Sequence, residues 1–125
     1  MKVMIVVTHL LGTGHLTRAL TLGRAFANAG DQVVLVSGGV PVGHLDFDGV
    51  ELVQLPPLKS DGVDFSRVLT AEGVVADAAY LEARQGALLD TFADSRPDLL
   101  ITELFPFGRR ILRAEFTALL LAAQT

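Results

Sequence analysis

Hydrophobic residues alternate along this chain between short continuous runs and longer stretches with helical spacing. Residues 3–7 form a continuous β-branched and apolar run, and residues 32–37 contain another. Such runs are typical of strands buried on both faces of a parallel sheet. Between them, apolar residues recur every three or four positions from Leu16 to Ala27, which indicates a helix with one buried face. A strand, a helix and a strand in this order predict a right-handed βαβ unit.

Two glycines belong to this predicted helix. Gly23 falls on its apolar face, which suggests that the helix approaches the sheet closely. Gly30 stands where a helix C-terminus favours a left-handed residue, so we expect the helix to end there.

The second half of the chain repeats this order less regularly. Residues 50–55 alternate and predict a third strand that ends before Pro56 and Pro57, because proline cannot serve a central ladder. A polar, turn-rich stretch at 58–66 predicts a surface loop. A helix is predicted from about Val74. We expect its apolar residues Ala78, Leu81, Leu88, Leu89 and Phe92 to face inward, and Asp77, Glu82, Arg84, Asp90 and Asp94 to face outward.

The last part of the chain predicts one more strand and one more helix. Residues 98–102 read as a fourth buried strand, and residues 103–107 as the loop that follows it. A final helix opens at Gly108, with Leu119 and Leu120 on its apolar stripe. We therefore predict a single α/β domain over residues 1–125, a Rossmann-like doubly wound parallel sheet in three α/β/α layers. The expected strand order is 3-2-1-4, and ligands bind where the chain direction switches, between the first and fourth strands.

Composition excludes several classes of protein. The net charge is −4, so the basic footprint of a nucleic-acid-binding protein is absent. The chain has no cysteine, which excludes disulfides, thiol catalysis and sulfur-ligated zinc and agrees with a reducing compartment. No apolar run is long enough for a membrane span. We expect a cytoplasmic protein, with the inner face of the membrane as an alternative location.

The stretch around two glycines, residues 8–18, is the strongest candidate site. Gly12 and Gly14 permit a tight turn that leaves backbone N–H groups uncovered. A helix that begins near Gly14 presents its first N–H groups and positive dipole end to a phosphate or carboxylate. His15 then lies in the first turn, beside any ligand held there. The alternative is a tight strand-to-helix connection with a solvated His15.

The expected topology gathers further residues at the carboxyl edge of the sheet. Glu103 follows a buried strand, and a carboxylate in that position can have a raised pKa and act as a general base. The alternatives for Glu103 are a solvated loop acid and a cap for the last helix. Arg109 and Arg110 lie near a predicted helix N-terminus, where the helix dipole disfavours cations. Either they bind an anionic partner, or they are two solvated arginines. The candidate catalytic residues are His15 and Glu103. The candidate substrate-binding residues are Thr8, His9, Gly12, Thr13, Gly14, Ser37, Gly38, Pro106 and Arg109. The spacing of His9, His15 and His44 predicts no metal site.

The glycine turn and the residues at the strand ends do not match the familiar phosphate-binding motifs. The turn reads GxGxxT, without the third small residue of a dinucleotide fingerprint, and no acid follows the second strand to hold a ribose. The Gly-Lys-Ser/Thr triplet of a P-loop is absent, and the first strand ends in Thr8 and His9 rather than in the acid of a phosphate receiver. NAD is therefore disfavoured, and we expect no cofactor.

Two segments resemble a known family. The first is the opening MKVMIVVTHLLGTGHLTRALTLGRAFANAGDQVVLVSGG, and the second is RPDLLITELFPFGRR at 96–110. They resemble the N-terminal domain of two-domain GT-B glycosyltransferases, closest to the family-28 group of the lipid I N-acetylglucosaminyltransferase and to bacterial predicted glycosyltransferases. In that family the N-terminal domain holds the acceptor and the C-terminal domain holds the nucleotide-sugar donor. The resemblance implies an acceptor-side or pyrophosphate-contacting role for Gly12, Gly14 and His15.

These observations lead to one expectation about function. The chain is expected to be the acceptor-side half of a glycosyltransferase that moves a hexosyl group from a nucleotide sugar to an acceptor hydroxyl. Its expected partners are that donor, held by a missing C-terminal domain, and a small-molecule, glycan or lipid-linked acceptor. We expect a truncated chain that is inactive alone and associates as a homodimer. The alternatives are a non-catalytic nucleotide- or phosphate-binding module and a partner-dependent subunit.

Overall fold

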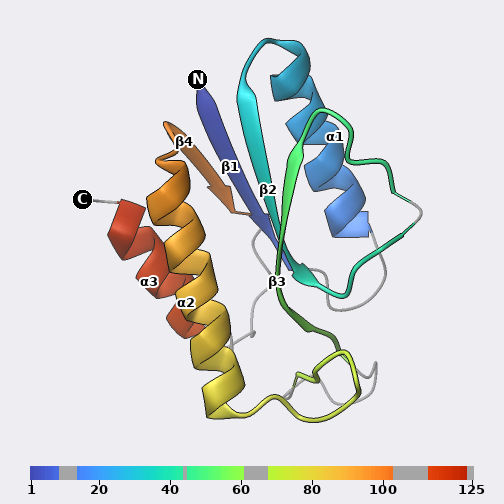
Figure 1. Cartoon of the computed structure of the whole chain (residues 1–125), viewed down its shortest axis with the longest axis vertical. Helices are drawn as coiled ribbons and strands as arrows, with labels where there is room; N and C mark the ends of the chain where they lie inside the picture. Colours follow the sequence, from blue (N-terminus) through green and yellow to red (C-terminus); the bar gives the residue numbers. More distant parts are fainter. Residues whose placement is uncertain (9–13, 44, 61–67, 103–112, 124–125) are drawn as a thin grey trace.

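The computed structural model describes residues 1–8, 14–43, 45–60, 68–102 and 113–123. The strands are β1 (Lys2–Val7), β2 (Gln32–Gly39), β3 (Glu51–Leu58) and β4 (Leu99–Thr102), and the helices are α1 (Gly14–Asn28), α2 (Ala78–Ser95) and α3 (Arg113–Ala123). The strands form one parallel sheet in the order β3-β2-β1-β4 (Figure 1). This is the predicted order, with the change of direction between β1 and β4.

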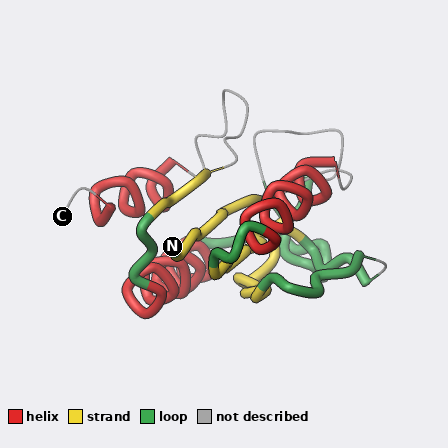
Figure 2. The backbone as a smooth tube through the Cα atoms, turned by 90° about the horizontal axis from the view of Figure 1, so that it is seen from above, coloured by secondary structure: helices red, strands yellow, loops and turns green. Residues whose placement is uncertain are grey.

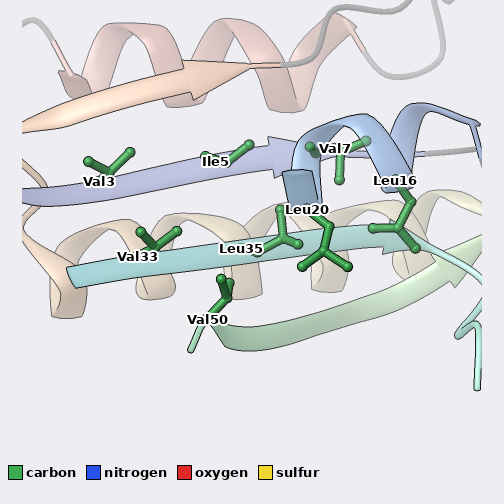
Figure 3. Close-up of a cluster of buried hydrophobic side chains, with 9 residues drawn as sticks. Val3, Ile5, Val7, Leu16, Leu20, Val33, Leu35 and Val50 are labelled. Carbon is green, nitrogen blue, oxygen red and sulfur yellow. The ribbon is translucent and has the colours of Figure 1, made fainter. Parts of the chain in front are cut away.

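The helices cover both faces of the sheet, and each face has its own core. Helix α1 lies on one side, whereas α2 and α3 lie on the other (Figure 2). Because successive strand residues point to opposite faces, odd-numbered positions of β1 such as Ile5 pack with Leu20 of α1 (Figure 3). Even-numbered positions such as Met4 pack with Leu88 of α2 and Leu119 of α3. The predicted three-layer α/β/α arrangement is confirmed.

Both glycines of the first helix behave as the sequence predicts. A Cβ on Gly23 would lie 3.3 Å from Cγ1 of Val33, so this glycine does allow α1 to approach the sheet closely. Gly30 has a φ of +96°, and its amide donates to the carbonyl oxygen of Ala27 at 3.0 Å. It follows the end of α1 in the left-handed conformation expected of a helix C-terminus.

The third strand is longer than predicted. Strand β3 continues through Pro56 and Pro57 to Leu58, which is completely buried. Within the described sheet β3 pairs with β2 alone, and an edge strand tolerates proline because one of its sides needs no ladder hydrogen bond. The stretch predicted as a loop therefore begins inside a strand and continues with an isolated antiparallel bridge between Lys59 and Leu69.

Helix α2 begins later than its hydrophobic pattern suggests. Asp77 caps it, since its carboxylate accepts a hydrogen bond from the amide of Tyr80 at 2.8 Å. The helix therefore starts at Ala78 rather than near Val74, and Val74 is 63% exposed. An Asn, Asp, Ser or Thr residue directly before a helix marks its start. The position of Asp77 therefore sets the start of α2, and the apolar residues before it do not.

Helix α3 buries one part of its predicted stripe. Leu119 is fully buried against the α2 face of the sheet, as predicted, but Leu120 is 47% exposed. Leu121 is 59% exposed. Along the described ranges, none of the helices combines the length and apolarity needed to cross a membrane.

Candidate functional site

The carboxyl edge of the sheet brings together residues that are distant in sequence. Val7 of β1 is in register with Ser37 of β2, which places Thr8 beside Gly38. Of the predicted site residues, the structure describes Thr8, Gly14, His15, Ser37 and Gly38. Outside the described residues lie His9, Gly12, Thr13, Glu103, Pro106 and Arg109, so their predicted roles remain predictions.

Arg84, in the middle of α2, joins the strand ends at this edge. Its Nη2 donates to Oγ1 of Thr8 at 2.7 Å and to the carbonyl oxygen of Gly38 at 3.1 Å. Its Nε donates to the carbonyl oxygen of Pro56 at 3.1 Å. Its Nη1 donates to Oε1 of Glu115 in an ion pair. One guanidinium thus links the ends of β1 and β2 and the middle of β3 to helix α3.

The prediction that Arg84 faces solvent is wrong, because its side chain is completely buried. It lies three residues after Leu81 and four before Leu88, and such spacing places all three on one helix face. The charge of Arg84 suggested an outward position, but the helical period was the better signal. Sequence analysis also gave no role to Glu115, which is 5% exposed.

The contacts of Arg84 define what it does. Its four hydrogen bonds engage four of the five N–H donors of a guanidinium. Two charges removed from water are tolerated only when they are paired and hydrogen-bonded, as Arg84 and Glu115 are here. Arg84 is therefore a clamp that fixes the edge of the sheet.

Gly38 is required by this clamp. A Cβ at this position would lie 1.9 Å from Nη2 of Arg84 and 2.1 Å from Oγ1 of Thr8. Both distances are far below van der Waals contact, and both neighbours are buried. The absence of a side chain at Gly38 is thus explained by the guanidinium, without a ligand.

Tyr80 extends the polar network by one helical turn. Its hydroxyl donates to the carbonyl oxygen of Pro57 at 2.8 Å. Burial raises the pKa of Tyr80 above its ordinary value, and the carboxylate of Glu72 adds to the increase, whereas the nearby charge of Arg84 opposes it. Tyr80 therefore stays a neutral donor that ties α2 to the end of β3.

His15, the candidate base, lies in the first turn of α1 and is half-buried. Nη2 of Arg18, one turn later, lies 2.9 Å from Nδ1 of His15. Arginine has donors and no acceptor, so Nδ1 accepts this hydrogen bond and a neutral ring carries its proton on Nε2. His15 thus presents an N–H group through Nε2 and a lone pair toward Arg18.

Ser37 faces the other side of the sheet from Thr8 and Gly38. The strand alternation places its side chain on the α1 face. A pocket of about 90 Å³ lies there, lined by Leu16, Ser37, Pro41, Val42, Gly43, Phe47, Leu52 and Gln54. The side chain of Gln54 donates to the carbonyl oxygens of Ser37 at 3.1 Å and Gly39 at 2.7 Å. These bonds hold the end of β2 where its register with β3 shifts.

Groups of acidic, histidine or cysteine side chains that could hold a metal ion do not occur within the described ranges. The site therefore consists of a clamp on the α2 face, a pocket on the α1 face and a histidine at the start of α1. Thr8 and Gly38 are brought together by Arg84, whereas Ser37 and His15 stand apart from this cluster.

Comparison with known proteins connects this architecture to one class of fold. No protein-family model and no curated protein matches the sequence. Among solved structures, the chain is similar to apo UGT2 of Phytolacca americana, with a TM-score of 0.55 and 18% sequence identity. The match covers 95% of this chain and 28% of UGT2, so the chain corresponds in length to a minor part of that protein. The structure is thus an α/β Rossmann-like half-domain with the fold of part of a GT-B glycosyltransferase.

Proposed function

We propose that this chain is the acceptor-side half of a glycosyltransferase. The observation that carries the proposal is the position of His15. It stands in the first turn of the helix that follows β1, at the carboxyl edge of a sheet whose fold is similar to that of UGT2. In doubly wound sheets this edge is where ligands bind.

The reaction transfers a hexosyl group from a nucleotide sugar to an acceptor hydroxyl. The acceptor oxygen forms a bond to the anomeric carbon, the bond from that carbon to the diphosphate oxygen breaks, and the nucleoside diphosphate leaves. The acceptor proton passes to a general base. A donor-binding domain, in the same protein or a partner, would supply the groups that hold the diphosphate.

His15 is the proposed base among the described residues. Its lone pair is at Nδ1, engaged with Arg18. The hydrogen bond to Arg18 is exposed, and exposed polar pairs cost little to separate. In the proposed reaction an acceptor hydroxyl takes the place of Arg18 at Nδ1. Glu103, outside the described residues, is the second proposed base.

The direct test is a transfer assay on the complete enzyme that carries this chain. A panel of nucleotide hexoses is mixed with hydroxyl acceptors, and mass spectrometry detects an acceptor that gains one hexose together with a released nucleoside diphosphate. We expect such a product, and we expect none from the 125-residue chain alone. Nucleotide binding by the complete protein without transfer would favour the non-catalytic module. Micromolar NADH binding by the chain would favour a dehydrogenase-like domain and overturn the proposal.

A further inference from the structure

Arg84 and Glu115 form a buried ion pair that the proposed reaction does not use. Arg84 is completely buried and Glu115 is 5% exposed, and the guanidinium bonds to the strand ends at the carboxyl edge of the sheet. Removing two charges from water is costly even when they are paired, and well-packed apolar residues often stabilise a protein as much. Stability alone therefore does not explain the pair, and the segments that it holds supply a reason.

The first segment held by the guanidinium is the end of β1. Nη2 of Arg84 donates to Oγ1 of Thr8 at 2.7 Å, and Thr8 is 1% exposed. Residues 9–13 separate Thr8 from Gly14, the first residue of α1, and His15 is the second residue of that helix. The chain that leads from β1 to His15 therefore starts at a residue whose hydroxyl is held in place.

Helix α1 itself is packed on the sheet by apolar side chains. Leu16 and Leu20 lie in one core cluster with Ile5 and other residues of the sheet (Figure 3). Apolar contacts are non-directional, whereas a hydrogen bond weakens steeply when its distance or angle changes. The bond from Arg84 to Thr8 thus adds a directional restraint at the strand end that precedes α1.

The second segment held by the guanidinium is the start of α3. Nη1 of Arg84 donates to Oε1 of Glu115, which lies in the first turn of α3. Residues 103–112, among them the second proposed base Glu103, stand in the sequence between the end of β4 and the start of α3. One guanidinium therefore holds the residue before one candidate stretch and the helical turn after the other.

We infer that Arg84 is a positioning residue for His15 and acts through the hydroxyl of Thr8. Its importance for catalysis rests on the proposed function, whereas the restraint on His15 does not. The role needs no contact between Thr8 and a substrate, because Thr8 is buried and its hydroxyl is engaged by Arg84. Loss of the bond should misplace His15, and a misplacement of about 1 Å can lower a rate by about 10²-fold.

The test breaks the bond at Thr8, because Arg84→Met is expected to remove much of the stability of the fold. Thr8→Val keeps the shape of the side chain without its hydroxyl, and Thr8→Ser keeps the hydroxyl. In the complete enzyme, Thr8→Val should lower kcat by about 10- to 10²-fold and leave KM within about threefold. Thr8→Ser should restore most of kcat. Thr91→Val is the matched control, because the Thr91 hydroxyl donates to the carbonyl oxygen of Ala87 in its own helix, and it should leave kcat unchanged.

A double variant separates positioning from a general loss of structure. If Thr8 acts through His15, Thr8→Val should lower kcat by less than about twofold in an enzyme that already contains His15→Gln. A general loss of structure would instead lower kcat by the same factor in both backgrounds. Equal factors, or a kcat of Thr8→Val within about threefold of the unmodified enzyme, would overturn the inference and leave the proposed function standing.

The restraint itself is measured without sugar transfer. In the isotope-labelled chain of 125 residues, the ring resonances of His15 should move farther in Thr8→Val than in Thr91→Val and should return in Thr8→Ser. Unmoved His15 resonances in Thr8→Val would overturn the inference even if the complete enzyme is active. Shifted resonances together with a complete enzyme that transfers no sugar would keep the restraint on His15 and refute the proposed function.

Discussion

Replacing Arg84 with methionine removes the clamp and leaves Glu115 buried without its partner. Methionine keeps most of the length and apolar volume of the side chain but has no N–H donors. Oγ1 of Thr8 and the carbonyl oxygens of Gly38 and Pro56 also lose a donor. The perturbation therefore isolates the polar contribution of Arg84 from its packing.

The expected loss follows from the burial of both charges. Breaking one side of a buried ion pair costs about 3–5 kcal/mol, and Arg84 and Glu115 are 0% and 5% exposed. A domain of this kind has a total stability of about 5–15 kcal/mol, so Arg84→Met should remove a large fraction of it. Adding Glu115→Leu should restore stability, because the double variant leaves no unpaired buried charge.

Urea unfolding followed by circular dichroism measures these differences. Arg84→Met should lower the free energy of unfolding by at least about 3 kcal/mol, and the double variant should lose less than Arg84→Met alone. Arg96→Met, at an exposed arginine just after α2, is the control and should change it by about 0.5 kcal/mol or less. A loss of free energy of unfolding under about 1 kcal/mol for Arg84→Met would refute the clamp. So would a double variant that loses more than Arg84→Met and Glu115→Leu lose together when each is measured alone.

Further predictions concern neighbouring residues. Gly38→Ala should destabilise the fold by about 2–4 kcal/mol, within the range for overpacked or disrupted buried sites, whereas Gly86→Ala, a helix position where a Cβ meets nothing within 4 Å, should stabilise it by about 0.5–1 kcal/mol; similar urea midpoints for both would contradict the close packing at Gly38. Tyr80 is the sole tyrosine, so absorbance of the tyrosinate reports its pKa, which should exceed 10.0. Because the pKa of Tyr80 is higher in the folded state, the contribution of its neutral hydroxyl to the free energy of unfolding is complete below pH 10 and is lost as the pH rises through the folded pKa. Tyr80→Phe should remove this part of the loss of stability at alkaline pH, and a titration midpoint of the tyrosine at or below 10.0 would be inconsistent with burial. The exposed Leu120 and Leu121 should support self-association, which sedimentation equilibrium detects and Leu121→Glu should weaken; a concentration-independent monomer of 13.3 kDa would argue against it.

The fold follows from the sequence because its signals are local and agree with one another. The apolar run of β1, the helical spacing of α1 and the conformation required at Gly30 all lie within the first βαβ unit, whose handedness is fixed. The strand order followed from that unit and the next. The end of β3 did not, because proline marks a strand end in a central position but is accepted at an edge, and edge position is a property of the whole sheet.

The candidate site was harder to predict because its central contact is long-range. Arg84 donates a hydrogen bond to Thr8, which lies 76 residues away in the sequence. The sequence around either residue contains no motif that predicts this contact. A charged residue within an apolar helical stripe is the signal that could have found it, since such a residue must be buried with a partner. Ser37 was predicted from its place at a strand end, but its face of the sheet, and so its pocket, depended on register.

The rate of sugar transfer by His15→Gln, measured in the complete enzyme, tests the central claim most directly. Glutamine keeps hydrogen-bonding groups at the first turn of α1 but cannot take the acceptor proton. With His15 as the base, kcat should fall by about 10²-fold or more, whereas Arg18→Gln, at the residue that donates to Nδ1, should change it much less. A change of less than about threefold for both His15→Gln and Glu103→Gln, against that expected loss, would show that neither residue takes the proton and would contradict the account.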